Sequence, residues 1–154
     1  MPSYKNLLDI LINKNISISL AESCTGGRLS KIFTDKPGIS KIFIMGLVTY
    51  SNSSKIKILN IDPKIIKKYG AVSKETAYSM SSNLQKISKS KICISTSGIA
   101  GPNGASELKP IGLVYIGITF KNKTKVFKKK FIGSRDIIQN KTIKFCFDEI
   151  KKLI

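Results

Sequence analysis

The sequence has no histidine and only three cysteines among its 154 residues. The lack of histidine excludes a Ser-His-Asp triad, a Cys-His dyad and a histidine-ligated metal centre. Cys24, Cys93 and Cys146 lie far apart without Cys-x-x-Cys spacing, which argues against a disulfide framework or a thiolate zinc site. We therefore expect no metal and no cofactor. A hydrolase built on this chain would need lysine, a carboxylate, tyrosine or water as its base.

Acidic residues and arginine are also scarce. The chain has 27 basic and 9 acidic residues, a net charge of +18, and its arginines are Arg28 and Arg135. The lysines are scattered over every expected element, and neither arginine forks for guanine nor aromatic stacking positions are apparent. A bias toward lysine, isoleucine and asparagine is what an AT-rich genome imposes at tolerant surface positions. Specific nucleic-acid binding is therefore not expected, and non-specific attraction of polyanions stays open as an alternative.

Long hydrophobic runs are absent. No apolar stretch approaches the roughly 20 residues of a membrane span, and Asp9 and Asn13 interrupt the N-terminal apolar segment, which lacks a signal-peptide layout. The length fits one domain over residues 1–154, and an apolar content of 42% is enough for a core. We expect a cytoplasmic protein that does not contact a membrane.

Helical and strand patterns alternate along the chain. Strands are expected at 16–21, 41–50, 91–96, 111–120 and 124–132, and the short connection at 121–123 predicts an antiparallel hairpin. Helices are expected at 3–14 with Ser3 as cap, at 25–34, from an Asn52 or Ser53 cap to Leu59, at 62–69, at 74–88 after Ser73, and from Ser134 to 152. Gly46 marks a bulge or a close approach. This order predicts a three-layer α/β/α sandwich with a mixed sheet.

The stretch ISLAESCTGGRLSKIF at residues 18–33 changes from a strand pattern to a polar turn and then to a helix pattern. The start of a helix leaves backbone N–H groups free, and its dipole favours an anion there. Gly26 and Gly27 allow a ligand to approach the backbone, and Ser23 can present its hydroxyl at the strand end. The stretch predicts either a site for a ligand phosphate or an oxyanion, or an ordinary turn in which Thr25 caps the helix.

Two further polar segments, 50–55 and 97–104, also follow strands. Ligand sites in α/β sheets lie beyond the carboxyl ends of the strands, so the three segments together predict an active site. Without histidine, a serine–lysine pair is the natural hydrolytic arrangement, provided that burial or a neighbouring cation lowers the pKa of the lysine. Ser23 is the best nucleophile and Lys55 the best base, although any single lysine can equally be solvated.

Three more residues have open roles at this stage. Ser97 can relay a proton, orient a substrate or only satisfy its own turn. Glu22 can pair with Lys55 or with Arg28. Cys24, in the turn, is the cysteine whose reactivity is worth testing, whereas Cys93 and Cys146 are expected to be inert core residues.

Five segments, AESCTGG, VTYSNSSK, YGAVSKET, SGIAGPNG and KPIGLVYIGI, follow one another in this order. They resemble the C-terminal domain of the CinA competence/damage-inducible protein family, and the match runs from about residue 3 to 152. Stand-alone members of this size look like nicotinamide-nucleotide amidohydrolases. The resemblance implies hydrolysis of nicotinamide mononucleotide to nicotinate mononucleotide and ammonia. It also implies a nucleophile at Ser23 and a base at Lys55.

The resemblance extends to the substrate site. Tyr50 and the hydroxyl of Ser97 are expected in it, the family usually having threonine at the latter position. The substrate-binding residues that we expect are Glu22, Thr25, Gly26, Gly27, Tyr50, Gly98, Gly101 and Arg135. A homo-oligomer, a dimer or larger, is also expected.

The sequence departs from the family pattern near its last expected helix. Ser134 stands where the family has aspartate, and Gln139 stands where an arginine is usual, whereas Arg135 is kept. These changes predict altered affinity or rate rather than an altered fold. They leave open a catalytically weakened nucleotide-binding or sensor module as the alternative.

Overall fold

The computed structural model describes residues 4–154, so the predicted Ser3 cap lies outside the described residues. Its centre is a five-stranded sheet with the order β2-β1-β3-β4-β5. The first three strands along the chain pair in parallel, and the last two add antiparallel pairs, which confirms the predicted mixed sheet. The strands are β1 (Ile18–Glu22), β2 (Phe43–Val48), β3 (Ile92–Gly98), β4 (Leu113–Phe120) and β5 (Lys123–Lys130).

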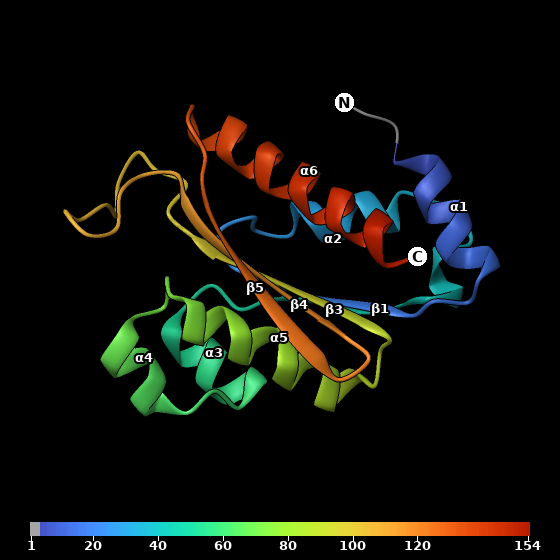
Figure 1. Cartoon of the computed structure of the whole chain (residues 1–154), viewed down its shortest axis with the longest axis horizontal. Helices are drawn as coiled ribbons and strands as arrows, with labels where there is room; N and C mark the ends of the chain where they lie inside the picture. Colours follow the sequence, from blue (N-terminus) through green and yellow to red (C-terminus); the bar gives the residue numbers. More distant parts are fainter. Residues whose placement is uncertain (1–3) are drawn as a thin grey trace.

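Helices cover both faces of this sheet, as the three-layer prediction requires (Figure 1). One layer holds α1 (Lys5–Asn13), α2 (Arg28–Thr34) and α6 (Arg135–Leu153). The other layer holds α3 (Asn52–Leu59), α4 (Pro63–Tyr69) and α5 (Lys74–Ser88). A short 3₁₀ helix, Ile39–Lys41, leads into β2. Within the described residues, no helix combines the length and the apolar character that crossing a membrane requires.

Each layer of helices buries its own apolar cluster against the sheet. The cluster under α1, α2 and α6 includes Phe33, whose ring stacks on Phe43 and Phe147 at centroid distances of 5.6 and 5.3 Å. The cluster under α3, α4 and α5 includes Met80 and Leu84 of α5, which are fully buried. Because β1 pairs with a strand on each side and helices cover both faces of the sheet, all five of its residues are buried, including the polar Ser19 and Glu22.

Parallel pairing brings the carboxyl ends of β1, β2 and β3 to one edge of the sheet. Glu22 is aligned with Val48 on one side and with Thr96 on the other. The residues that follow these three positions therefore meet at the same edge.

Local signals fix most of the remaining geometry. The side chains of Asp62, Ser73 and Ser134 cap their helices, whereas the cap of α3 is Ser51 rather than the predicted Asn52 or Ser53. Ser51 has the extended backbone that a cap needs, and its Oγ accepts from Ser54 N at 3.0 Å. Gly46 marks a close approach, because a Cβ there would lie 2.4 Å from Ser30 Oγ.

Candidate active site

Ser23 and Lys55 lie together at this edge of the sheet. Ser23 directly follows β1, and Lys55 lies in the first turn of α3, which begins just after β2. The Nζ atom of Lys55 donates to Ser23 Oγ at 3.0 Å, to the Thr49 carbonyl at 2.8 Å and to the Tyr50 carbonyl at 3.2 Å. The Lys55 side chain is only 1% exposed, so it is not one of the many solvated lysines.

Burial changes the acid–base character of Lys55. Removal from water disfavours its charged form and lowers its pKa from 10.5 to about 8, while the nearby Cys24 opposes this shift to a smaller extent. Two carbonyl oxygens, of Thr49 and Tyr50, fix two N–H groups of the amine. In the neutral form, the remaining position toward Ser23 can hold the lone pair, which is the geometry of a general base.

A pocket of about 240 Å³ opens over the Ser23–Lys55 pair. Seven of the predicted site residues line it: Ser23, Tyr50, Lys55, Ser97, Gly98, Gly101 and Arg135. The other lining residues are Cys24, Ala71, Val72, Ile99, Ala100, Asn103 and Gly104. Four of them belong to the predicted 97–104 segment, whereas Ala71 and Val72 were not predicted as site residues. All of them lie on the strand-end segments or on the 70–72 stretch, which precedes α5 and carries no polar side chain that would have marked it.

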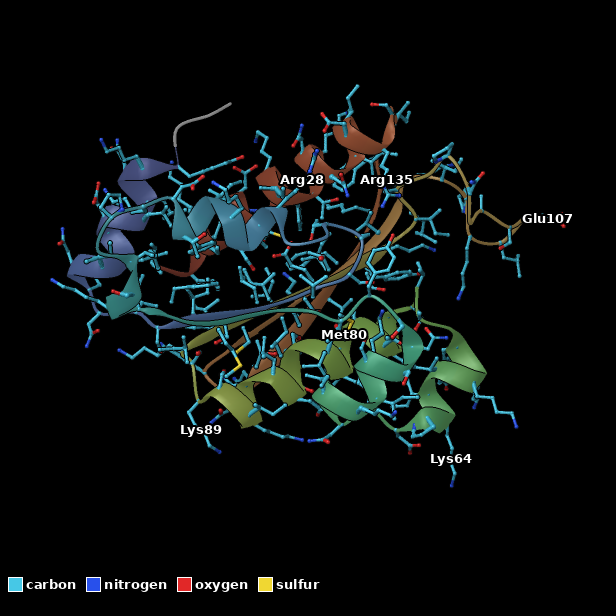
Figure 2. The ribbon with its side chains drawn as sticks, turned by 180° about the vertical axis from the view of Figure 1, so that it is seen from behind. Arg28, Lys64, Met80, Lys89, Glu107 and Arg135 are labelled. Atoms are coloured by element: carbon cyan, nitrogen blue, oxygen red, sulfur yellow. The ribbon has the colours of Figure 1, made fainter. Side chains whose placement is uncertain are left out.

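Arg135 closes one side of this pocket. It is the first residue of α6, and its guanidinium donates to the Gly101 carbonyl at 2.9 Å and to the Tyr50 hydroxyl at 3.1 Å. It thereby ties the loop after β3 to Tyr50, which lies just beyond β2. Figure 2 shows Arg135 at the base of the projecting loop that carries Glu107. Arg135 and Lys55 are the two cationic side chains among the lining residues.

Ser97 belongs to the wall of the pocket. Its side chain is 1% exposed, and its Oγ donates to the Ala71 carbonyl at 2.7 Å. Among the described residues it makes no side-chain hydrogen bond to Ser23 or Lys55. Its hydroxyl therefore holds the 70–72 stretch against β3 in this structure.

Glu22 has a different place from the one predicted. Its carboxylate is fully buried and accepts hydrogen bonds from Thr25 Oγ1, Gly27 N, Leu29 N, Ser30 N and Ser30 Oγ. The predicted pairing with Lys55 or Arg28 is wrong, since Lys55 contacts Ser23 and two carbonyls, and Arg28 forms an ion pair with Asp136 at 2.6 Å. The free N–H groups and the dipole at the start of α2 attract the nearest carboxylate, which is that of Glu22.

The turn after Ser23 consequently holds an internal anion. Thr25 is not the helix cap, a position taken by Gly27. The Thr25 hydroxyl instead donates to Glu22 at 2.6 Å and lies 2.8 Å from Thr96 Oγ1. Glu22, Thr25, Gly26 and Gly27 are not among the residues that line the pocket. In contrast, the backbone N–H groups of Cys24 and Thr25 have no hydrogen-bond acceptor among residues 4–154.

Cys24 lines the pocket but is unsuited to be a nucleophile. Burial raises the pKa of its thiol to about 12, so the thiol stays protonated at neutral pH. Its carbonyl accepts from Nε2 of Gln139 at 2.8 Å, and this buried contact fixes the turn against α6. Sequence reasoning identified Gln139 only as a departure from a family pattern and missed this contact.

The chain is thus an α/β domain, and the buried Ser23–Lys55 pair beyond the carboxyl ends of its parallel strands forms a candidate serine–lysine active site. Residues 2–154 match the family described as CinA C-terminal domain. The chain belongs to this family, as the resemblance predicted.

Relatives of known sequence and known structure agree with this assignment. Competence-damage inducible proteins of Acetivibrio thermocellus and Alkaliphilus oremlandii are 43% and 46% identical to the chain over 94% and 93% of its length. The chain spans 35% of the length of each of these relatives. A solved CinA superfamily protein of Enterobacter cloacae is 30% identical with a TM-score of 0.90, covering 97% of this chain and 89% of that one. A competence damage-inducible protein of Klebsiella pneumoniae is 27% identical with a TM-score of 0.90, covering 96% of this chain and 92% of that one.

Proposed function

We propose that this domain hydrolyses the carboxamide of nicotinamide mononucleotide to nicotinate mononucleotide and ammonia, with Ser23 as nucleophile and Lys55 as general base. The observation that carries this proposal is the 3.0 Å hydrogen bond between Lys55 Nζ and Ser23 Oγ, made by a buried lysine whose pKa is lowered to about 8. The choice of substrate rests on the sequence resemblance to nicotinamide-nucleotide amidohydrolases.

In the first step, Ser23 Oγ attacks the carboxamide carbon while its proton passes to the neutral amine of Lys55. The carbonyl π bond opens, and its oxygen becomes an oxyanion. The backbone N–H group of Cys24 is the candidate donor to this oxyanion, because Cys24 directly follows the nucleophile and lines the pocket, and its N–H has no acceptor among the described residues.

In the second step, the tetrahedral intermediate collapses. The carbon–nitrogen bond breaks, and the Lys55 ammonium returns a proton to the departing nitrogen, which leaves as ammonia. Water then attacks the acyl-serine while Lys55 takes one of its protons. As the bond between the acyl carbon and Ser23 Oγ breaks, the Lys55 ammonium returns this proton to Oγ, and the released acid ionises to the carboxylate product. The balance of this sequence needs only water as co-reactant, which agrees with a site that needs no metal.

The pocket offers groups for both ends of such a substrate. The nucleophile lies at its floor, and the Arg135 guanidinium lies at its rim beside the exposed Tyr50 ring. A substrate phosphate is the group that a guanidinium best complements. We expect Arg135 to exchange its contact with the Tyr50 hydroxyl for a contact with this phosphate.

The test is an assay of the purified chain with nicotinamide mononucleotide. We expect ammonia and nicotinate mononucleotide to appear in equal amounts, and Lys55→Met to release neither. Saturable binding of the mononucleotide without ammonia release would replace the proposal with the nucleotide-binding module that the departure at Gln139 left open. If the chain neither binds the mononucleotide nor releases ammonia from it, this substrate is excluded.

A further inference from the structure

A second and larger pocket lies at the opposite end of the sheet. It has a volume of about 610 Å³ and is lined by Ile16, Gln85, Lys86, Lys89, Ser90, Lys91, Phe120, Lys121 and Asn122. These residues come from the end of α5, the connection into β3, the segment before β1 and the β4–β5 turn. Most of the length of β3 separates this pocket from Ser97, so the proposed hydrolysis does not involve it.

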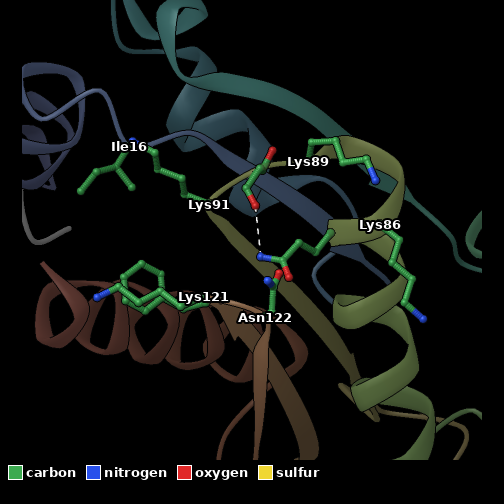
Figure 3. A pocket seen from close by; sticks show the side chains of 9 residues that line it. Ile16, Lys86, Lys89, Lys91, Lys121 and Asn122 are labelled. Carbon is green, nitrogen blue, oxygen red and sulfur yellow. Dashed lines mark hydrogen bonds between the residues drawn. The ribbon is translucent and has the colours of Figure 1, made fainter.

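Positive charge surrounds this pocket without any carboxylate among its lining residues. Lys86, Lys89, Lys91 and Lys121 contribute four ammonium groups, and none of the ion pairs among the described residues includes them. The Lys91 amine donates to the Asn15 carbonyl at 2.9 Å, and the Lys121 amine lies over one face of the Phe120 ring, 5.2 Å from its centroid. Lys86 and Lys89 stand on one side, and Lys121 stands on the other (Figure 3). None of these lysines has a carboxylate partner among the described residues, so their charge would attract an anion that enters the pocket.

The inner walls of the pocket are of another kind. The half-buried ring of Phe120, the Ile16 side chain and the carbon stems of the lysines provide apolar surface. Gln85 is fixed by a 3.2 Å hydrogen bond from its Nε2 to the Ser90 carbonyl, the dashed line in Figure 3, and Asn122 supplies a second amide to the lining. A ring with hydrogen-bonding edges suits such walls, and a phosphate suits the rim.

We propose that this pocket binds a nucleoside monophosphate, with its ring against Phe120 and its phosphate among the lysines. The volume falls in the range of small-molecule sites, roughly 300 to 1,000 Å³. A single-stranded nucleic acid would instead need a groove with several stacking platforms, and Phe120 is the one aromatic residue among those that line the pocket. The proposal is independent of the proposed hydrolysis.

The experiment titrates the full chain with adenosine monophosphate, adenosine and inorganic phosphate by calorimetry at physiological salt. We expect saturable binding of the monophosphate and at least about tenfold weaker binding of adenosine or phosphate alone. The double variant Lys89→Asn, Lys121→Asn removes one charge from each side. Both positions have positive φ, 59° and 51°, which asparagine adopts readily, so the fold should be kept. This variant should bind the monophosphate at least about tenfold more weakly, which corresponds to about 1.4 kcal/mol.

A matched control distinguishes a site from bulk charge. Lys64→Gln, Lys67→Gln removes two exposed lysines of α4, at the other end of the helix layer from Lys89 (Figure 2), and should bind as the parent does. Equal losses in both double variants, or no saturable binding by the parent, would overturn the proposal. So would a loss on Arg135→Ala instead of the lysine variant, which would place the ligand in the Ser23 pocket. The parent could also bind a thymidine oligonucleotide of twelve nucleotides more tightly than the monophosphate, and the lysine variant could lose this binding. That result would replace the proposed monophosphate site with a nucleic-acid-binding surface.

Discussion

Titration of Lys55 should be visible in the stability of the fold as well as in catalysis. The unfolded lysine has a pKa near 10.5 and the buried one a pKa of about 8, so the unfolded state holds its proton more firmly. Below pH 8 both states are protonated, and the folded state carries the full cost of burying the ammonium. That cost disappears as pH rises from 8 toward 10.5, and the free energy of unfolding therefore increases across this window.

The magnitude follows from the two pKa values. Between pH 7 and pH 9.5 the linkage relation gives Lys55 a stabilising contribution of about 2 kcal/mol. The assay is urea unfolding of the parent and of Lys55→Met at both pH values. Methionine has a similar length and does not titrate. All other groups contribute equally to the two proteins, so the difference between their free energies of unfolding isolates Lys55.

The exposed Lys64 supplies the control, and Lys64→Met should leave the pH dependence of stability unchanged. The reasoning is refuted if the difference in free energy of unfolding between the parent and Lys55→Met stays constant within about 0.5 kcal/mol from pH 7 to 9.5. The amine would then be no easier to deprotonate than an exposed one. Where chemistry limits turnover, the same titration predicts a rate that rises about tenfold per pH unit below pH 8 and levels off above it.

Three further predictions concern the neighbours of this amine. Ser23→Ala should lower ammonia release at least about 10³-fold with a change in stability within about 1 kcal/mol, whereas Cys24→Ser should stay active; the reverse result would move the nucleophile to Cys24. Lys55→Arg should be as inactive as Lys55→Ala because a guanidinium cannot give up its proton, and substantial activity in it would make Lys55 a positioning residue. Glu22→Gln should lower the free energy of unfolding by about 3 kcal/mol, since an amide nitrogen cannot accept from the α2 N–H groups, and unchanged urea unfolding would contradict this account of Glu22.

Periodicity and strand order were sufficient to predict the sheet and the gathering of the polar strand ends. Parallel strands necessarily place their carboxyl ends together, so Ser23 and Ser97 had to lie near each other, and the cap position after β2 directed Lys55 back toward them. What the sequence could not supply were contacts that depend on how a distant helix crosses the sheet. Gln139 reaches the Cys24 carbonyl from 115 positions away, and no local pattern encodes such a contact.

The error at Glu22 has a more general physical meaning. The free N–H groups at the start of α2 predicted an anion correctly, but a buried carboxylate within the same turn excludes an external one, because two negative charges there would repel each other. Glu22 leaves the N–H groups of Cys24 and Thr25 as the unused donors nearest to Ser23. In the proposed reaction the turn therefore serves two purposes: the N–H groups of Gly27, Leu29 and Ser30 hold the Glu22 carboxylate, and that of Cys24 is the candidate donor to the oxyanion.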